Sequence, residues 1–270
     1  MIKVIILTSS RQGFASFQLA ELVKSKKIIV QAVVLNEGLI MNKKKHYKRK
    51  IAKIFKIGLF GALNGIRMRK WYSTGVYKYL DIPTIESLCK EHNITLSITP
   101  TINSSQTIEY FKNANADIGL SLGNGYIGKK VFSIPKFGMI NVHHEELPAY
   151  QNAQSIIWQL YNDSDNTGYT IHKIDKHIDT GEILFKEVIP IIFKQNLEST
   201  VSLNYSILWK KSSEGLVLLL ENFENYFKKS FPQGQGKSYT TPSLKQYLKI
   251  LRNFKKKYML STSSIGNGGG

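Results

Sequence analysis

Three side chains in this sequence are of the types that catalyse acyl transfer to an amine: Asn141, His143 and Asp179. An amide can donate a hydrogen bond to an oxyanion, an imidazole can shuttle a proton, and a carboxylate can orient the imidazole. The first two residues lie in Asn141-Val142-His143, the third opens an Asp-Thr-Gly turn, and the segment Gly168–His172 lies between them. We expect these segments to converge at one end of a sheet.

The elements that must position these residues alternate between strands and helices. Short apolar runs predict strands at residues 3–8, 28–35, 94–99, 117–122 and 138–143, and the intervening segments predict helices at 14–25, 84–92, 105–113 and 128–132. Such alternation indicates an α/β fold with a mostly parallel, twisted sheet covered on both faces. Ligands of open α/β sheets bind beyond the carboxyl ends of the strands. Both Asn141 and the Leu122–Ile127 loop are expected at that edge.

The second half of the chain has a different pattern. It predicts a helix at 154–161, strands at 168–175 and 182–190, a long helical segment at 197–227 and a mixed segment at 232–258. We therefore expect a catalytic domain over residues 1–192, a small C-terminal helical or mixed appendage over 193–260, and a disordered tail over 261–270.

The formal net charge of +18 comes from two segments. Residues 38–80 hold 12 Lys and Arg, residues 225–270 hold nine, and neither segment contains Asp or Glu. Such segments commonly meet phosphate, nucleic acid or a membrane surface, although a solvated Lys-rich face is an equal alternative. The single cysteine, Cys89, and the absence of a long apolar run favour a reducing, cytoplasmic compartment.

The basic segment at about 41–80 is predicted to be a helical insertion. Its apolar residues fall on one helical stripe, made of Ile51, Ile54, Phe55, Leu59, Leu63 and Ile66. We rank a cover over the sheet edge or a homodimer contact first. Peripheral contact with an anionic membrane ranks second.

Together these motifs resemble those of the folate-dependent formyltransferases, over roughly residues 3–191. The family's Asn-x-His and Leu-Pro-x-Tyr motifs match Asn141–His143 and Leu147–Tyr150, its Gly-x-Thr-[Ile/Val]-His motif matches Gly168–His172, and its Asp-x-Gly turn matches Asp179–Gly181. The chain is most similar to the sugar N-formyltransferases and to the catalytic domain of methionyl-tRNA formyltransferase.

The resemblance implies that the formyl donor is 10-formyltetrahydrofolate. Asn141 would then stabilise the oxyanion, His143 would pass a proton to the leaving nitrogen, and Asp179 would orient His143. The pterin would bind at Asn124, Gly125, Tyr126 and Ile127 and at the loop carrying Lys176 and Ile178. We expect His172 and Thr180 to support the Asp179 loop.

Departures from the family pattern lie on the acceptor side. His144-Glu145-Glu146 replaces the common Pro-Ser-Leu, and Gln151-Asn152 replaces a basic residue and glycine. Carboxylates and amides hold sugar hydroxyls and amines well, so Glu145, Gln151 and Asn152 are predicted to bind the acceptor, and Arg11 to pair with a phosphate. A nucleotide-linked amino sugar for surface polysaccharide biosynthesis is therefore the leading acceptor.

Other functions remain open from the sequence. A methionyl-tRNA formyltransferase-like enzyme is weakened because no run of alternating strands follows Ile191. A folate-binding protein or formyl-folate hydrolase could use the same three residues on water. An RNA-binding module is disfavoured because the basic segments lack a recognised RNA motif, so we consider a nucleic-acid partner unlikely. Adjacent His143, His144 and Glu145 diverge, and we predict no metal site.

Overall fold

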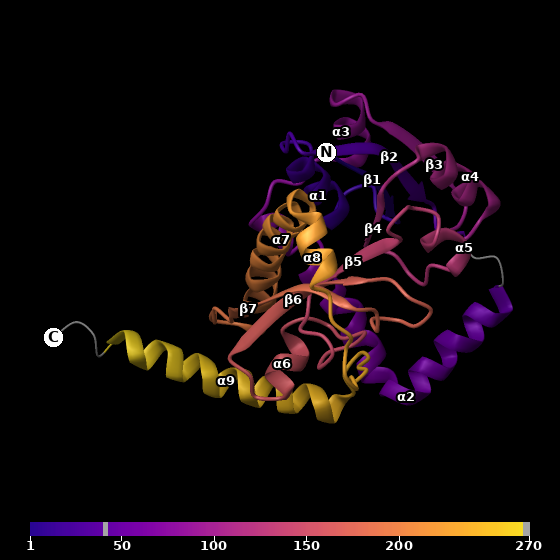
Figure 1. Cartoon of the computed structure of the whole chain (residues 1–270). Helices are drawn as coiled ribbons and strands as arrows, with labels where there is room; N and C mark the ends of the chain where they lie inside the picture. Colours follow the sequence, from indigo (N-terminus) through magenta and orange to yellow (C-terminus); the bar gives the residue numbers. More distant parts are fainter. Residues whose placement is uncertain (40–42, 267–270) are drawn as a thin grey trace.

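A single twisted sheet organises the molecule (Figure 1). The structure is a computed structural model that describes residues 1–39 and 43–266, and within these ranges seven strands lie side by side in the order β3-β2-β1-β4-β5-β6-β7. Their bounds in chain order are β1 Ile2–Thr8, β2 Ile28–Asn36, β3 Thr95–Thr99, β4 Ile118–Leu122, β5 Met139–His143, β6 Asn166–Lys173 and β7 Ile183–Pro190.

The first five strands are parallel, and β6 and β7 are antiparallel additions. The expected α/β fold with a mostly parallel sheet is therefore confirmed. Parallel neighbours need crossover connections, which the helices of the first half provide. All five expected strands of that half are present within about two residues of their predicted ends.

Helices cover both faces because alternate residues of the buried strands point to opposite sides. On β1, Val4 and Ile6 share one core with α1 and α7, while Ile5 and Leu7 share a second core with α4 and α5. The remaining bounds are α1 Phe14–Leu22, α2 Lys43–Arg69, α3 Ile85–Glu91, α4 Ser105–Ala114, α5 Lys129–Phe132, α6 Ile157–Tyr161, α7 Leu197–Glu221, α8 Phe223–Lys228 and α9 Leu244–Gly266, with 3-10 turns at Lys70–Tyr72 and Val76–Lys78.

The segment expected to be an appendage shares the main core. Val201, Leu208 and Leu216 of α7 are completely buried in the same cluster as β1 and α1, and Ile250 of α9 also belongs to it. Asn222 separates α7 from α8, so the single helical segment expected there is two helices. The boundary at residue 192 stays a prediction, but α7 packs as an integral layer of the fold.

In the structure, α9 continues through residues 261–266 to Gly266. The disordered tail expected from residue 261 stays a prediction, and residues 267–270 lie outside the described part. None of the helices within residues 1–39 and 43–266 is long and apolar enough to cross a membrane.

The insertion forms α2, as predicted, but its apolar stripe does not cover the sheet. Ile51, Phe55, Leu59, Leu63 and Ile66 are exposed, whereas the residues packed on the body lie on another face, at Ile57, Gly61, Asn64 and Met68. Periodicity defines the apolar side of a helix and not the direction in which that side points. The cover role expected for this stripe is therefore wrong.

We predict that Gly215→Ala destabilises the protein. A Cβ atom at Gly215 of α7 would lie 2.2 Å from the hydroxyl of buried Tyr169 on β6. Overpacking of this kind costs about 1–3 kcal/mol, which outweighs the gain of about 1 kcal/mol from replacing a helical glycine by alanine. Urea denaturation should show a lower free energy of unfolding.

Two further variants control this measurement. Gly234→Ala, where a Cβ meets nothing within 4 Å, should leave stability nearly unchanged. Adding Tyr169→Phe to Gly215→Ala removes the nearest atom and should recover part of the loss. A Gly215→Ala protein as stable as the parent would show that α7 does not pack closely against Tyr169.

Candidate active site

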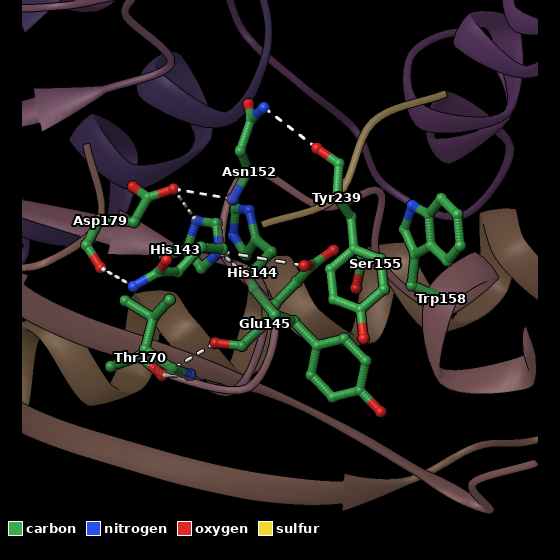
Figure 2. Close-up of polar contacts among 12 residues, drawn as sticks. His143, His144, Glu145, Asn152, Ser155, Trp158, Thr170, Asp179 and Tyr239 are labelled. Carbon is green, nitrogen blue, oxygen red and sulfur yellow. Dashed lines mark hydrogen bonds and ion pairs between the residues drawn. The ribbon is translucent and has the colours of Figure 1, made fainter. Parts of the chain in front are cut away.

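A cavity of about 430 Å³ lies where β4 and β5 end and the β6–β7 loop folds over them. Asn141, His143 and Asp179 all line it, so the structure brings the three predicted residues together. Figure 2 shows His143 and Asp179 facing each other, with Glu145 below them. The site lies at the carboxyl edge of the sheet, as expected for an open α/β fold.

The strand register places the candidate catalytic side chains on one face. In the antiparallel ladder, Asn141 of β5 lies opposite His172 of β6, and His143 lies opposite Thr170. Directly opposed residues point to the same side, and residues two apart on one strand do so as well. All four side chains therefore point to one side of the sheet, while Ile171 between them points into the core.

His172 fixes the orientation of the Asn141 amide. Its Nδ1 lies 2.9 Å from the Lys173 carbonyl oxygen, which can only accept, so Nδ1 carries the proton. Burial and neighbouring His143 lower the pKa of His172 to about 4, which keeps the ring neutral near pH 7. Nε2 is then an acceptor for the Asn141 amide nitrogen at 3.2 Å. The second N–H of that amide is left to donate elsewhere.

His143 is held at one ring nitrogen. Its Nε2 donates to the Tyr150 carbonyl oxygen at 2.8 Å, and its Nδ1 faces Oδ2 of Asp179 at 3.9 Å. That distance is longer than a hydrogen bond but within ion-pair range. Nδ1 is therefore the nitrogen at which His143 can take up or release a proton beside a carboxylate.

Asp179 is held by a loop with unusual backbone geometry. Its φ of 56° lies in the left-handed region, as does the 49° of Asn152, a conformation that Asp and Asn tolerate better than most residues. The Asn152 backbone N–H donates to Oδ2 of Asp179 at 3.0 Å, and Gln151 Nε2 donates to the Asp179 carbonyl oxygen at 3.3 Å. These contacts join the loop after β5 to the β6–β7 loop (Figure 2).

Thr180 and Gly181 of the β6–β7 turn each have a structural role. Thr180 donates through its hydroxyl to Asp175 at 2.8 Å, so it supports the loop as predicted but does not line the cavity. A Cβ at Gly181 would lie 1.8 Å from the Lys173 carbonyl oxygen. Only glycine allows this close approach of the two strands.

The loop predicted to hold the donor lines the cavity. Asn124, Gly125, Tyr126 and Ile127 are all cavity residues. The Asn124 side chain, however, donates to the Leu7 carbonyl oxygen at 2.6 Å and ties strand ends together. Tyr126 is exposed at the cavity and offers it an aromatic surface.

The β6–β7 loop supplies a second apolar side chain to the cavity. Ile178 is exposed and lines the cavity, and Asp175 and His177, which the sequence did not single out, also line it. Lys176 is absent from the cavity lining within the described residues. Tyr126 and Ile178 thus offer apolar contacts to a ligand in the cavity.

Among the residues predicted to bind the acceptor, Glu145 is the most deeply buried. It is 2% exposed and lines the cavity, and among the described residues neither carboxyl oxygen has a hydrogen-bond partner. Burial, followed by the nearby Asp179 carboxylate, raises its pKa well above the usual value. Its nearest basic group is His143 Nε2 at 3.9 Å. A buried polar group without a partner requires an explanation.

The other predicted acceptor residues are placed differently. Asn152 lines the cavity, and its side chain donates to the Tyr239 carbonyl oxygen at 3.2 Å. Gln151 supports the Asp179 loop from outside the lining. Arg11 does not reach the cavity, because it forms ion pairs with Glu86 and Glu37.

The structure also adds residues that sequence patterns missed. Tyr72, from the insertion, lines the cavity and donates to the Ser155 carbonyl oxygen at 2.7 Å. Tyr205 of α7 lines the cavity next to Tyr72, with the two ring centroids 4.9 Å apart, and its hydroxyl lies 3.3 Å from His144 Nδ1. Neither residue lies in a motif, and both reach the site through long-range packing. His144 points away from His143, as expected, and packs against Phe14.

No group of three or more His, Cys, Asp or Glu side chains within residues 1–39 and 43–266 is arranged to hold a metal ion. The prediction that the site needs no metal stays a prediction.

Comparison with known proteins identifies the class. The sequence model of the formyl transferase family matches residues 2–208, and the chain therefore belongs to this family. Methionyl-tRNA formyltransferase of Agathobacter rectalis is 28% identical over 148 residues, which are 54% of this chain and 46% of that protein. The Thermodesulfovibrio yellowstonii enzyme is 31% identical over 152 residues, 56% and 47% of the two chains. The chain thus spans about half the length of the curated relatives it matches.

Solved structures share the fold. A sugar N-formyltransferase from Shewanella aligns with a TM-score of 0.55 at 14% identity, over 94% of this chain and 88% of that chain. The Helicobacter canadensis N-formyltransferase, solved with folinic acid and dTDP-3-aminofucose, aligns with a TM-score of 0.53 at 19% identity, over 96% and 82%. The expected formyltransferase type of sheet is confirmed by these likenesses.

We predict that stability falls as the pH drops below about 6.5, partly because of two histidines. Burial lowers the pKa of His144 to about 3 and that of His172 to about 4. The unfolded chain binds these protons near pH 6.5 while the folded chain does not, so the contribution is full above that pH and is lost below it. Each group contributes a slope of up to about 1.4 kcal/mol per pH unit.

His144→Gln tests the assignment. Urea denaturation at several pH values between 7 and 5 should give a shallower decline for this variant than for the parent, whatever its absolute stability. His92→Gln, at a surface histidine, should keep the parent slope. Equal slopes for His144→Gln and the parent would mean that His144 is not buried neutral.

Proposed function

We propose that this chain transfers a formyl group from 10-formyltetrahydrofolate to the amine of a nucleotide-linked amino sugar. The observation that carries the proposal is the convergence of Asn141, His143 and Asp179 on one cavity. Asn141 and His143 of β5 bring a hydrogen-bond donor for an oxyanion and a proton carrier to the cavity. Asp179, in the turn between β6 and β7, brings a carboxylate. Membership of the formyl transferase family agrees with this chemistry.

The residues around the cavity fit a folate donor. The 124–127 backbone offers amides and carbonyls to a heterocycle, and Tyr126 and Ile178 offer apolar contacts to its faces. When bound, 10-formyltetrahydrofolate supplies a formyl carbon that an amine can attack. A concave site with apolar walls and few polar groups is typical of such ligands.

Asn141 then stabilises negative charge, and His143 and Asp179 handle the proton transfer. The free N–H of the Asn141 amide, oriented by His172, stabilises the negative charge that develops on the formyl oxygen. His143 takes up, at Nδ1, the proton that the attacking amine loses and passes it to the folate nitrogen as the bond between that nitrogen and the formyl carbon breaks, and Asp179 stabilises the cationic ring. A neutral amine is the nucleophile, so this proton transfer is required for turnover.

Glu145 supplies a binding group for the acceptor. Its unpaired, buried carboxyl beside His143 can bind an amine or a hydroxyl of the incoming sugar. A ligand donor that reaches this carboxyl relieves the cost of burying it, which is about 1–3 kcal/mol for a polar group. An acceptor with no polar group that reaches Glu145 would leave this carboxyl unpaired, and the cost of burying it would remain.

The sugar acceptor is also supported by the extent of the structural likeness. The sugar N-formyltransferases align over 94% and 96% of this chain, whereas the glycinamide ribonucleotide transformylase of Symbiobacterium toebii aligns over 82%. The curated sequence relatives favour a second candidate, formylation of methionyl-tRNA. A formyl-folate hydrolase differs from both, because it needs no acceptor amine.

An acceptor panel distinguishes these functions. The protein is incubated with 10-formyltetrahydrofolate and either nucleotide-linked amino sugars, initiator Met-tRNA or glycinamide ribonucleotide, and mass spectrometry detects the formylated product. We expect a mass gain on an amino sugar. Formylation of the tRNA alone would select the second candidate, and formate release without any acceptor would select the hydrolase.

We predict that Asn141→Ala lowers kcat by about 10²–10³, because one oxyanion donor contributes this much. Asp179→Asn should lower kcat by a similar or larger factor, since it removes the carboxylate beside His143. Asn166→Ala and Asp81→Asn, at exposed positions away from the lining, are the matched controls. Full activity in either site variant would contradict the proposed roles.

We predict that Glu145→Gln raises KM for the acceptor at least about tenfold, with a smaller effect on KM for the folate. Burial favours the neutral carboxyl in the free protein, but an amine of the acceptor that binds as a cation would draw it into the charged form, which the amide of the same size cannot adopt. A hydrogen bond to a charged group contributes about 1.5–3 kcal/mol. Steady-state kinetics with each substrate varied in turn gives both values. Equal effects on the two KM values would place Glu145 outside the acceptor site.

A further inference from the structure

The outward face of α2 is an exposed apolar surface that the proposed chemistry leaves unexplained. In the first part of the helix, Tyr47, Ile51, Ile54 and Phe55 lie on one side of the helical wheel and all are exposed, Phe55 at 85%. Single exposed apolar residues are common, but contiguous ones mark an interaction surface. In Figure 1, α2 lies along the edge of the molecule and projects away from the sheet.

The surface continues past a break in the helix. Gly58, with φ 75° and ψ 166°, interrupts the helical geometry. Beyond it, Gly61, Asn64, Gly65 and Met68 face the body, with Gly61 against Pro242 and Gly65 against Thr241. The opposite side is again apolar and exposed, at Leu59, Leu63 and Ile66. Both parts of α2 are therefore apolar on a side that the protein does not cover.

The charge on this helix has one sign. Arg49, Lys50, Lys53 and Lys56 are exposed on the side of the first part away from Ile51 and Phe55, whereas Lys44 and Lys48 are exposed next to that apolar stripe. Residues 38–80 contain no Asp or Glu that could neutralise them. Cations beside an exposed apolar stripe are complementary to a surface that is anionic at its boundary and apolar beneath.

We propose that α2 binds the surface of an anionic lipid bilayer, with Tyr47, Ile51, Phe55, Leu59, Leu63 and Ile66 inserted among the lipids and the flanking lysines at the headgroups. Nucleic acid fits less well, since phosphate contacts need the cations but leave the aliphatic stripe in water. A second copy of this chain fits less well, since it would bring two basic helices together. The proposal is independent of the acceptor that the cavity binds.

Vesicle sedimentation with the full chain tests this. Vesicles of phosphatidylcholine alone are compared with vesicles containing about one third phosphatidylglycerol, at low and high salt. We expect binding to the anionic vesicles and much weaker binding at high salt, where the Debye length falls from about 10 Å to about 3 Å. Lys50→Gln, Lys53→Gln and Lys56→Gln together should weaken binding about a hundredfold.

The apolar stripe is tested separately. Phe55→Ser with Leu59→Ser should weaken vesicle binding at least about tenfold and leave the fold intact, since Phe55 and Leu59 are 85% and 70% exposed. Val188→Ser with Ile98→Ser, at exposed apolar residues of β7 and β3, is the matched control and should bind as the parent does. Circular dichroism verifies that every variant is folded.

Three outcomes would overturn the proposal. The first is a parent protein that binds neither kind of vesicle. The second is a dimer in analytical ultracentrifugation that Phe55→Ser with Leu59→Ser dissociates, without vesicle binding, which would assign the surface to a second copy. The third is tRNA binding in a filter assay that the lysine substitutions abolish and the serine substitutions do not, again without vesicle binding.

Discussion

The antiparallel pairing of β6 on β5 is the constraint on which the site depends. Without β6 and β7, the five parallel strands would leave Asn141 of β5 at a bare edge of the sheet. The reversed direction of β6 puts His172 directly across from Asn141 and carries the chain back over the cavity in the turn that holds Asp179. Because side chains alternate along a strand, a shift of one residue in this register would turn His172 away from the cavity and Ile171 towards it.

The loop after β5 and residues 237–240 of the C-terminal segment then hold the side chains of the site in place. The backbone of Gln151 pairs with Lys237 and Tyr239, and the ring of Tyr239 stacks on that of Tyr150 at 5.6 Å. The Trp158 indole donates to the Thr240 carbonyl oxygen at 3.0 Å in the same region. The carbonyl that binds His143 and the N–H that binds Asp179 are thereby fixed by residues almost a hundred positions further along the chain.

Much of this arrangement could be predicted from the sequence, and the remainder depended on long-range contacts. Apolar runs ending in Asn141–His143 and Leu122–Ile127 locate the strand ends, because burial dictates both their composition and their length. The neighbours of Arg11 could not be predicted, since Glu37 and Glu86 reach it only in the folded chain. Tyr72 and Tyr205 have no motif around them, and their place at the cavity follows from how α7 and the insertion pack.

The orientation of the insertion could likewise not be predicted from its sequence. Its sequence defines an apolar side and a basic side correctly, but a helical period is unchanged when the helix is rotated about its axis. The contacts of Gly61 with Pro242 and of Gly65 with Thr241 set that rotation. The two glycines, rather than the apolar stripe, are what allow α2 to approach the C-terminal segment.

The neutral ring of His172 has a consequence for the polarity of the cavity. At present its Nε2 is an acceptor that fixes the Asn141 amide nitrogen at 3.2 Å. A proton on Nε2 would place two donors against each other at that distance, and the amide would relieve the conflict only by exchanging its oxygen and nitrogen. The orientation of Asn141 is thus set by a single lone pair, and the ring of His172 on the neighbouring strand decides which end of the amide faces the cavity.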